Sequence, residues 1–165
     1  MQVRSNYLAR AAPTFMNPNP SVNRELIHSR LINATQAQVF RAFSDPERLA
    51  RWWGPDGFTN TFEAFELKPN GVWRFVMQGP DGTDYRNECI FRELEAPHLV
   101  VIEHMSEAHH FFLTILFEAK RSQTLVGWRQ VFDSAEHRDQ IAAIVEPANE
   151  QNLNRLAAEV ARVKA

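Results

Sequence analysis

The 165-residue sequence has little cysteine, no long apolar run and no block of positive charge. The single cysteine, Cys89, excludes an internal disulfide and is typical of a reducing cytoplasm, where we expect the protein to reside. Apolar runs such as Leu99–Ile102 are far too short to span a bilayer, so we expect no membrane insertion. The formal net charge of −2, without a basic cluster, argues against nucleic acid as a partner.

Several motifs of catalysis and cofactor binding are also missing. The sequence contains no Gly-x-Ser-x-Gly, no glycine-rich phosphate loop and no His-Glu-x-x-His. These absences argue against hydrolase, nucleotide-binding and zinc-peptidase functions, and we expect no cofactor. His104, His109 and His110 surround one predicted turn, but no carboxylate or cysteine follows them at a ligand spacing. We therefore expect no metal site.

Aromatic residues, by contrast, are plentiful. The chain has twelve phenylalanines and four tryptophans but only two tyrosines, which indicates core or pocket material rather than a surface that stacks on nucleic acid. Hydrophobic residues make up 44% and charged residues 23%, as is ordinary for a globular protein. The length suits one domain with one core.

The N-terminal segment differs from the rest of the chain. Residues 1–23 contain three prolines and no acidic residue, and they lack the apolar segment of a secretory signal. We expect a flexible N-terminal extension over residues 1–23, followed by a single domain over residues 24–165. Two alternatives stay open, namely a natural start at Met16 and a targeting peptide.

Turn residues divide the middle of the chain into strands. After a first strand at Glu25–Asn33, a capping box at Thr35–Gln38 and the pair Asp45–Pro46 predict two short helices. Turns rich in proline and glycine then separate further strands, because proline presets φ and glycine supplies positive φ. These predicted strands are Phe58–Leu67, Val72–Gln78, Asp84–Leu94, Leu99–Met105, His110–Glu118 and Gln123–Phe132.

The C-terminal residues predict a long helix that Ser134 caps. From Pro147 onward the apolar residues, Leu153 among them, recur mostly at the i, i+3, i+4, i+7 spacing of one helix face, whereas Glu159 falls on the opposite, polar face. Because proline disrupts a helix interior, we expect a break near Val145–Glu146, which would give a short helix followed by a long one.

This order of elements predicts the fold class. A meander of strands twists and curls, and its concave apolar face must be covered by another element. The terminal helix is the one predicted element long enough to cover it. We therefore expect an α+β helix-grip fold, in which a curved antiparallel sheet of about six to seven strands wraps around the C-terminal helix, with two short helices after the first strand.

Five stretches of the chain resemble the START-like SRPBCC superfamily, and within it the subfamily named after the activator of the ninety-kilodalton heat-shock-protein ATPase. Together they cover most of the chain from about Arg24 to Ala165, and Trp-Trp-Gly-Pro and Gly-Pro-Asp-Gly-Thr-Asp-Tyr are their most specific parts. They are FSDPERLARWWGPDGFTN, PNGVWRFVMQGPDGTDYRNE, APHLVVIEH, TLVGWRQVFDSAEHRD and NEQNLNRLAAEVARV.

The resemblance implies a cavity between sheet and helix but no single function. Related proteins include lipid carriers, polyketide cyclases, self-resistance proteins and a co-chaperone domain. The co-chaperone normally carries an additional N-terminal domain, where this chain has only residues 1–23. The resemblance therefore does not by itself predict a chaperone activator.

Alternation along the strands assigns aromatic residues to the concave side. Trp73, Phe75 and Met77 share one face of their strand, where they would line both the core and the cavity. Trp128 and Gln130 share one face of the last strand, and a glutamine beside a tryptophan suits a pocket with apolar walls and a few orienting polar groups.

The polar candidates lie on the two middle strands. Tyr85 and Asn87 can each donate and accept a hydrogen bond, although an exposed pair near a hairpin is the alternative. His104 could donate to a ligand or act as a general base, and the resembling family also tends to place histidine here. The alternative is a half-buried histidine whose hydrogen bonds are made within the protein. Cys89 is expected to be inert packing. We expect one of the two rings of Trp52 and Trp53 to lie at the pocket mouth, and the other to pack where it closes one end of the sheet.

From this pattern we expect a protein that binds a hydrophobic or aromatic small molecule, without an assigned catalytic residue. Two alternatives stay open: a cyclase or lyase that uses His104, Tyr85 or a pocket carboxylate, and a stress- or chaperone-related interaction module. A pocket on the order of a few hundred Å3 would favour the first two functions, and a solidly packed sheet–helix interface would favour the third.

Uncovered strand edges are compatible with a homodimer. The predicted ligand-binding residues are Trp52, Trp53, Trp73, Phe75, Met77, Tyr85, Asn87, His104, Trp128, Gln130 and Leu153.

Overall fold

A computed structural model describes residues 23–164 of the chain. Apart from Asn23, the predicted N-terminal extension lies outside the described residues. None of the helices in the described range is long and apolar enough to cross a membrane.

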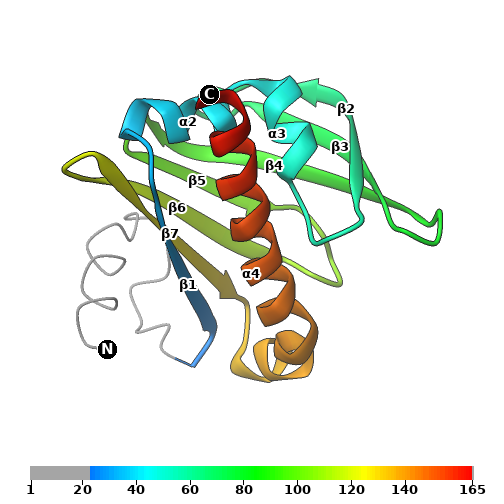
Figure 1. Cartoon of the computed structure of the whole chain (residues 1–165). Helices are drawn as coiled ribbons and strands as arrows, with labels where there is room; N and C mark the ends of the chain where they lie inside the picture. The colour runs from blue at the N-terminus through cyan, green and yellow to red at the C-terminus, as the bar shows by residue number, and fades with distance from the viewer. Residues whose placement is uncertain (1–22, 165) are drawn as a thin grey trace.

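Seven antiparallel strands form one curved sheet in the order β1-β7-β6-β5-β4-β3-β2 (Figure 1). Two short helices, α2 (Gln36–Ser44) and α3 (Pro46–Trp52), follow the first strand, and the long helix α4 (Ala135–Lys164) crosses the concave face. The predicted α+β helix-grip fold is confirmed. The strands are β1 (Glu25–Ile32), β2 (Thr59–Phe65), β3 (Val72–Gln78), β4 (Asp84–Glu95), β5 (Leu99–His104), β6 (Phe111–Lys120) and β7 (Gln123–Phe132).

The two short helices begin where their capping residues predict. The hydroxyl of Thr35 accepts from the backbone N–H of Gln38 at 3.3 Å, and the Gln38 side chain accepts from the backbone N–H of Thr35 at 2.8 Å, which completes the capping box. Asp45 ends α2 and caps α3, because its carboxylate accepts from the N–H groups of Glu47 and Arg48. The chain therefore turns sharply between the helices and carries the tryptophan pair to the concave side of the sheet.

Helix α4 is continuous, so the predicted break near Val145–Glu146 was wrong. Ser134 caps the helix by accepting from the N–H of His137 at 3.0 Å, and Pro147 lies inside it. A proline removes one backbone hydrogen bond and crowds the preceding turn, but its φ is compatible with a helix, so a long helix can bend at this point instead of ending. Figure 1 shows such a bend in the orange part of α4.

The core lies between the concave face of the sheet and the helices. Phe43 of α2 is at its centre, with ring centroids 6.3–6.4 Å from those of five other aromatic residues. These residues are Trp52, Trp53, Trp73, Phe91 and Phe117. From α4, Leu153, Leu156 and Val160 pack against the same cluster. Close aromatic packing at this end of the sheet leaves the opposite end of the concave face for a pocket.

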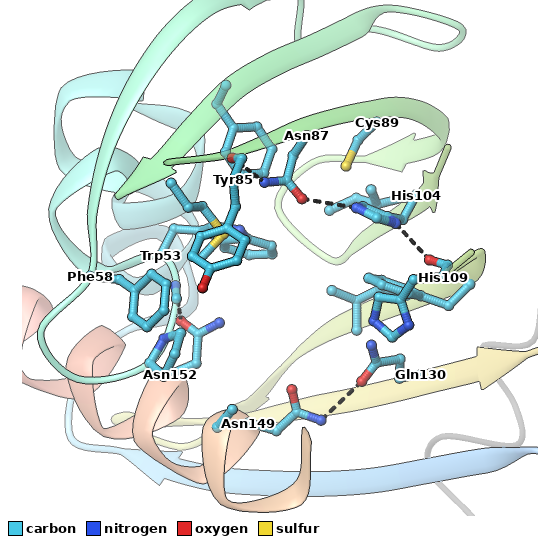
Figure 2. Close-up of a pocket in the computed structure, with 18 of the residues that line it drawn as sticks. Trp53, Phe58, Tyr85, Asn87, Cys89, His104, His109, Gln130, Asn149 and Asn152 are labelled. Atoms are coloured by element: carbon cyan, nitrogen blue, oxygen red, sulfur yellow. Dashed lines mark hydrogen bonds between the residues drawn. The ribbon is translucent and has the colours of Figure 1, made fainter. Parts of the chain in front are cut away.

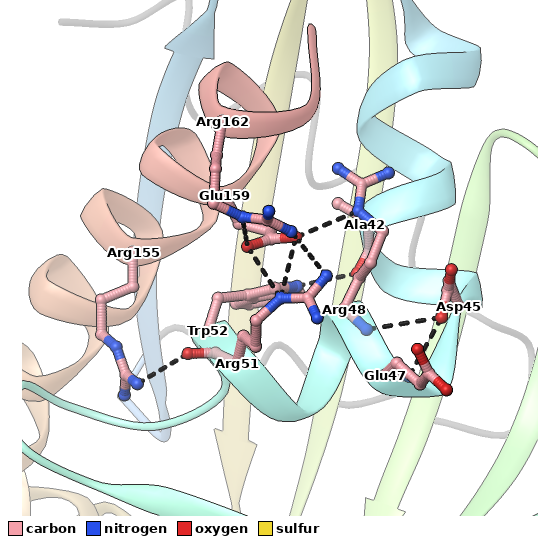
Figure 3. Close-up of polar contacts among 9 residues, drawn as sticks. All are labelled: Ala42, Asp45, Glu47, Arg48, Arg51, Trp52, Arg155, Glu159 and Arg162. Carbon is pink, nitrogen blue, oxygen red and sulfur yellow. Dashed lines mark hydrogen bonds and ion pairs between the residues drawn. The ribbon is translucent and has the colours of Figure 1, made fainter. Parts of the chain in front are cut away.

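A buried carboxylate ties α4 to α3 (Figure 3). Glu159 of α4 accepts from Nε of Arg48 at 3.1 Å, from Arg51 at 3.0 Å and from Arg162 at 3.0 Å. The helical pattern placed Glu159 on the polar, outward face, and that assignment was wrong because α3 packs over it. The three arginines replace the water that the carboxylate would otherwise bind.

Candidate functional site

A pocket of about 310 Å3 lies between the concave face of the sheet and α4 (Figure 2). Strands β3 to β7 form one wall, α4 contributes Ala148, Asn149 and Asn152, and the loop after α3 forms part of the rim. Its walls are mostly aromatic and aliphatic, and Phe111 and Leu113 of β6 extend them across the sheet. A volume of this order lies at the lower end of the range typical of small-molecule sites.

The structure brings eight of the predicted residues together around this pocket. The curvature of the sheet turns alternate side chains of neighbouring strands toward the same space, so residues far apart in sequence face one another. Their contact with a ligand stays a prediction. The eight residues are Trp53, Phe75, Met77, Tyr85, Asn87, His104, Trp128 and Gln130.

The other three predicted residues, Trp52, Trp73 and Leu153, lie in the core and not along the pocket. Trp52 donates from Nε1 to the carbonyl of Ala42 at 2.8 Å, which holds its ring under α2 while Trp53 faces the pocket. Trp73 and Leu153 are fully buried in the aromatic cluster. Alternation predicted the correct side of the sheet for Trp73, but the helices fill that part of the concave face.

Side chains of α4 hold the loop at the pocket rim. Gly54 N–H donates to Oδ1 of Asn152, and Asp56 N–H donates to Oε1 of Gln151, both at 3.1 Å. The guanidinium of Arg155 donates to five backbone carbonyl oxygens at 2.8–3.2 Å, those of Arg51, Trp53, Gly54, Pro55 and Phe58. Gly54 has a φ of +96°, a conformation that favours glycine. Side chains of α4 therefore fix the position of the loop that forms the rim.

The Arg155→Met variant should loosen this rim. Methionine keeps much of the aliphatic stem but leaves the carbonyls without their charged donor, so we expect the free energy of unfolding to fall by about 2 kcal/mol. Hydrogen exchange of the backbone amides of residues 54 and 56–58 should become faster, while exchange in β6 changes only as much as global stability does. Arg41→Met, at an exposed position on α2, is the control. Unchanged exchange at residues 54 and 56–58 would contradict this role.

The imidazole of His104 is held on both sides. Its Nδ1 donates to the carbonyl of His109 at 2.8 Å, and its ring stacks on Phe111 with centroids 4.6 Å apart. Its Nε2 lies 2.9 Å from Oδ1 of Asn87, and in a neutral ring this contact becomes a hydrogen bond when the Asn87 amide is turned over so that Nδ2 donates to Nε2. Burial lowers the pKa of His104, and burial together with His104 and His137 lowers the pKa of His109 to about 4. Both imidazoles are therefore neutral near neutral pH.

Cys89 lies in the pocket wall but is not an activated nucleophile. Burial, with a smaller contribution from the neighbouring Glu88, raises the pKa of its thiol. A thiol that stays protonated is a weak nucleophile.

The histidines around the β5–β6 turn do not converge on one point. His110 pairs with Glu103 at 2.9 Å and with Asp133 at 2.7 Å, whereas His104 and His109 face the pocket. In residues 23–164, no group of three or more histidine, cysteine, aspartate or glutamate side chains could hold a metal ion.

The family model of the activator of Hsp90 ATPase homolog 1-like proteins matches residues 33–161. The chain belongs to this family. The prediction made from the WWGP and GPDGTDY stretches is confirmed, and the solved structures that match share the SRPBCC-type fold. No curated protein matches the chain significantly.

Among the solved structures, a protein from Arthrobacter aurescens has a TM-score of 0.80 at 22% identity, over 91% of this chain and 93% of that one. A protein from Nitrosomonas europaea has a TM-score of 0.79 at 17% identity, over 88% of this chain and 99% of that one. A protein from Mycobacterium smegmatis has a TM-score of 0.75 at 20% identity, over 87% and 95%. At these identities the likeness supports the fold alone.

Sequence reasoning missed two polar residues that α4 contributes to the pocket in this member of the Hsp90-activator-like family. Asn149 and Asn152 lie on the buried face of α4 and line the pocket. A signal for them was present, because Asn149 precedes Leu153 by four residues and Asn152 precedes Leu156 by four, the spacing of one helix face. Polar residues at sheet-facing positions of a helix are costly to bury, so they point to a site.

Proposed function

We propose that the protein binds a hydrophobic or aromatic small molecule in the pocket between the sheet and α4. The observation that carries the proposal is the pocket itself, whose volume is about 310 Å3 and whose walls are mostly aromatic and aliphatic, with a few amide side chains. Small-molecule sites are typically of this size or larger and combine apolar walls with a few orienting polar groups. The ligand-binding fold of the family agrees with it.

Binding without catalysis is favoured over a cyclase or lyase reaction. A general base needs a free nitrogen that can take a proton from the ligand, whereas Nδ1 of His104 already donates to His109 and its unprotonated Nε2 lies 2.9 Å from the side-chain amide of Asn87. Tyr85 is half-exposed at the rim, where water would compete with it for a substrate. Catalysis by His104 would first require the contacts to His109 and Asn87 to break.

Titration with the uncharged dye N-phenyl-1-naphthylamine tests the proposal. The fluorescence of this dye rises in apolar surroundings, and its rings fit a pocket of this volume. We expect a saturable rise with one dye per chain, because the apolar walls would exclude water from it. A rise that never saturates, or no rise, would contradict the proposal.

A further inference from the structure

Three carboxamide side chains in the pocket are almost fully buried. Gln130 of β7 is 5% exposed, Asn149 of α4 is 7% exposed and Asn152 of α4 is 6% exposed. Burying an amide is costly unless its donor and acceptor both find partners. In the described part of the chain, each of these amides uses only one of its two polar atoms in a hydrogen bond.

The contacts of Asn152 fix which of its atoms faces the pocket. The backbone N–H of Gly54 donates to Oδ1 of Asn152 at 3.1 Å. Because a backbone N–H can only donate, the oxygen must face the loop, and the amide nitrogen is left toward the pocket. Figure 2 shows this nitrogen turned away from the loop. Asn152 therefore offers a donor to a ligand.

Asn149 and Gln130 offer two further hydrogen-bonding groups. Nδ2 of Asn149 donates to Oε1 of Gln130 at 3.0 Å, which leaves Oδ1 of Asn149 and Nε2 of Gln130 without a partner in the described residues. Figure 2 shows Oδ1 of Asn149 pointing into the pocket. If both amides were turned over, the two roles would be exchanged, so one acceptor and one donor remain in either case.

The pocket also lacks a charge that could hold an ionic ligand. No aspartate, glutamate, lysine or arginine among residues 23–164 lines it. Burial lowers the pKa of His104 and of His109, which keeps both imidazoles neutral near neutral pH. A carboxylate entering this space would lose its hydration without gaining a countercharge.

We propose that the pocket selects uncharged aromatic ligands that carry a hydrogen-bond acceptor beside a donor, as in a carboxamide, a lactam or a hydroxyketone, and discriminates against carboxylates of the same shape. The aromatic body would contact the walls around Trp53 and Trp128. The polar edge would complete the hydrogen bonds of Gln130, Asn149 and Asn152. This inference rests on the proposed function and names its ligand class.

Three compounds with the same ring system test the selection by displacement of N-phenyl-1-naphthylamine. These compounds are 2-naphthamide, 2-naphthoic acid and 2-ethylnaphthalene. The first two have nearly the same shape, but the acid is ionised at about pH 7. We expect 2-naphthamide to bind about tenfold or more tightly than 2-naphthoic acid, because the acid buries a charge without a partner. We also expect it to bind more tightly than 2-ethylnaphthalene, which cannot reach the free amide atoms.

The Asn152→Asp variant tests whether the amide side chains of the pocket cause this selection. Aspartate retains an oxygen for Gly54 but replaces the pocket-facing donor by an acceptor. The affinity for 2-naphthamide should fall about tenfold, with little change for 2-ethylnaphthalene. The matched control is Asn154→Asp, on the same helix, where the side chain is exposed and accepts from Arg30 outside the pocket. Thermal unfolding of each variant verifies that it is folded.

Equal affinities for 2-naphthamide and 2-naphthoic acid would overturn the inference and leave the proposed function standing. An unchanged preference in a folded Asn152→Asp variant would also overturn the assignment to the amide edge. Failure of the dye itself to bind would contradict the proposed function, and this inference with it.

Discussion

The Glu159→Gln variant should lose about 3 kcal/mol of the free energy of unfolding, although its side chain has almost the same shape. Glu159 is 6% exposed and accepts hydrogen bonds from Arg48, Arg51 and Arg162. A neutral glutamine would leave the buried guanidinium of Arg48 without its countercharge. Losing one partner of a buried ion pair is costly because the other charge stays desolvated. Chemical denaturation near neutral pH measures the loss.

The same carboxylate predicts how the stability of the wild type depends on pH. Burial by itself would raise the pKa of Glu159, but the hydrogen bonds from Arg162, Arg51 and Arg48 lower it to about 2, against an ordinary value of 4.5. The unfolded chain therefore binds this proton more readily than the folded one. The contribution of Glu159 is fully present above about pH 4.5 and is lost as the pH falls toward 2. The glutamine variant should lack this part of the acid dependence.

Glu150→Gln on the same helix is the matched control. Glu150 pairs with His28 and Arg30, but half of its side chain is exposed to solvent. Exposed ion pairs contribute little, so we expect this variant to lose less than about 1 kcal/mol. Equal losses in the two variants would contradict the role given to the buried carboxylate.

The Ala148→Trp variant should lower the affinity for N-phenyl-1-naphthylamine by about a hundredfold. Ala148 lines the pocket from α4, where its side chain is only half-buried. An indole at this position would extend into the space of about 310 Å3 that the dye needs. Because the added rings enter a pocket and not the packed core, the fold should be retained. Fluorescence titration measures the affinity, and circular dichroism verifies the fold.

Ala143→Trp is the control for this substitution. Ala143 lies on the same helix but is exposed. The same substitution is therefore made in α4 without placing a side chain in the pocket. Dye affinity should equal that of the wild type. If Ala148→Trp also binds the dye as tightly as the wild type, the dye occupies another site and the proposed pocket is wrong.

Local patterns in the sequence were sufficient for most of the fold. Strands β3 and β7 begin and end at the predicted residues, because proline, glycine and charged turn residues bound them on both sides. The capping box at Thr35 and the cap at Asp45 fixed the starts of α2 and α3, because these side chains accept hydrogen bonds from backbone N–H groups of the first helical turn. Alternation also placed Phe75, Met77 and Gln130 on the side of the pocket.

The misplaced side chains share one cause, which is that tertiary packing is invisible to a local pattern. Alternation gives the face of a residue but not its depth, so Trp73 and Leu153 were predicted at the pocket and lie in the core. Helical spacing placed Glu159 at the surface, where α3 in fact covers it. Pro147 indicated a break, but α4 continues through it.

Native mass spectrometry of the purified protein mixed with N-phenyl-1-naphthylamine tests the central claim most directly. Binding in the pocket between the sheet and α4 predicts a complex of one dye per chain for the wild type and for Ala143→Trp, and little or none for Ala148→Trp. It also predicts that any compound retained from the cells is hydrophobic or aromatic. A wild type that forms no complex, or a complex of equal abundance in Ala148→Trp, would contradict the claim.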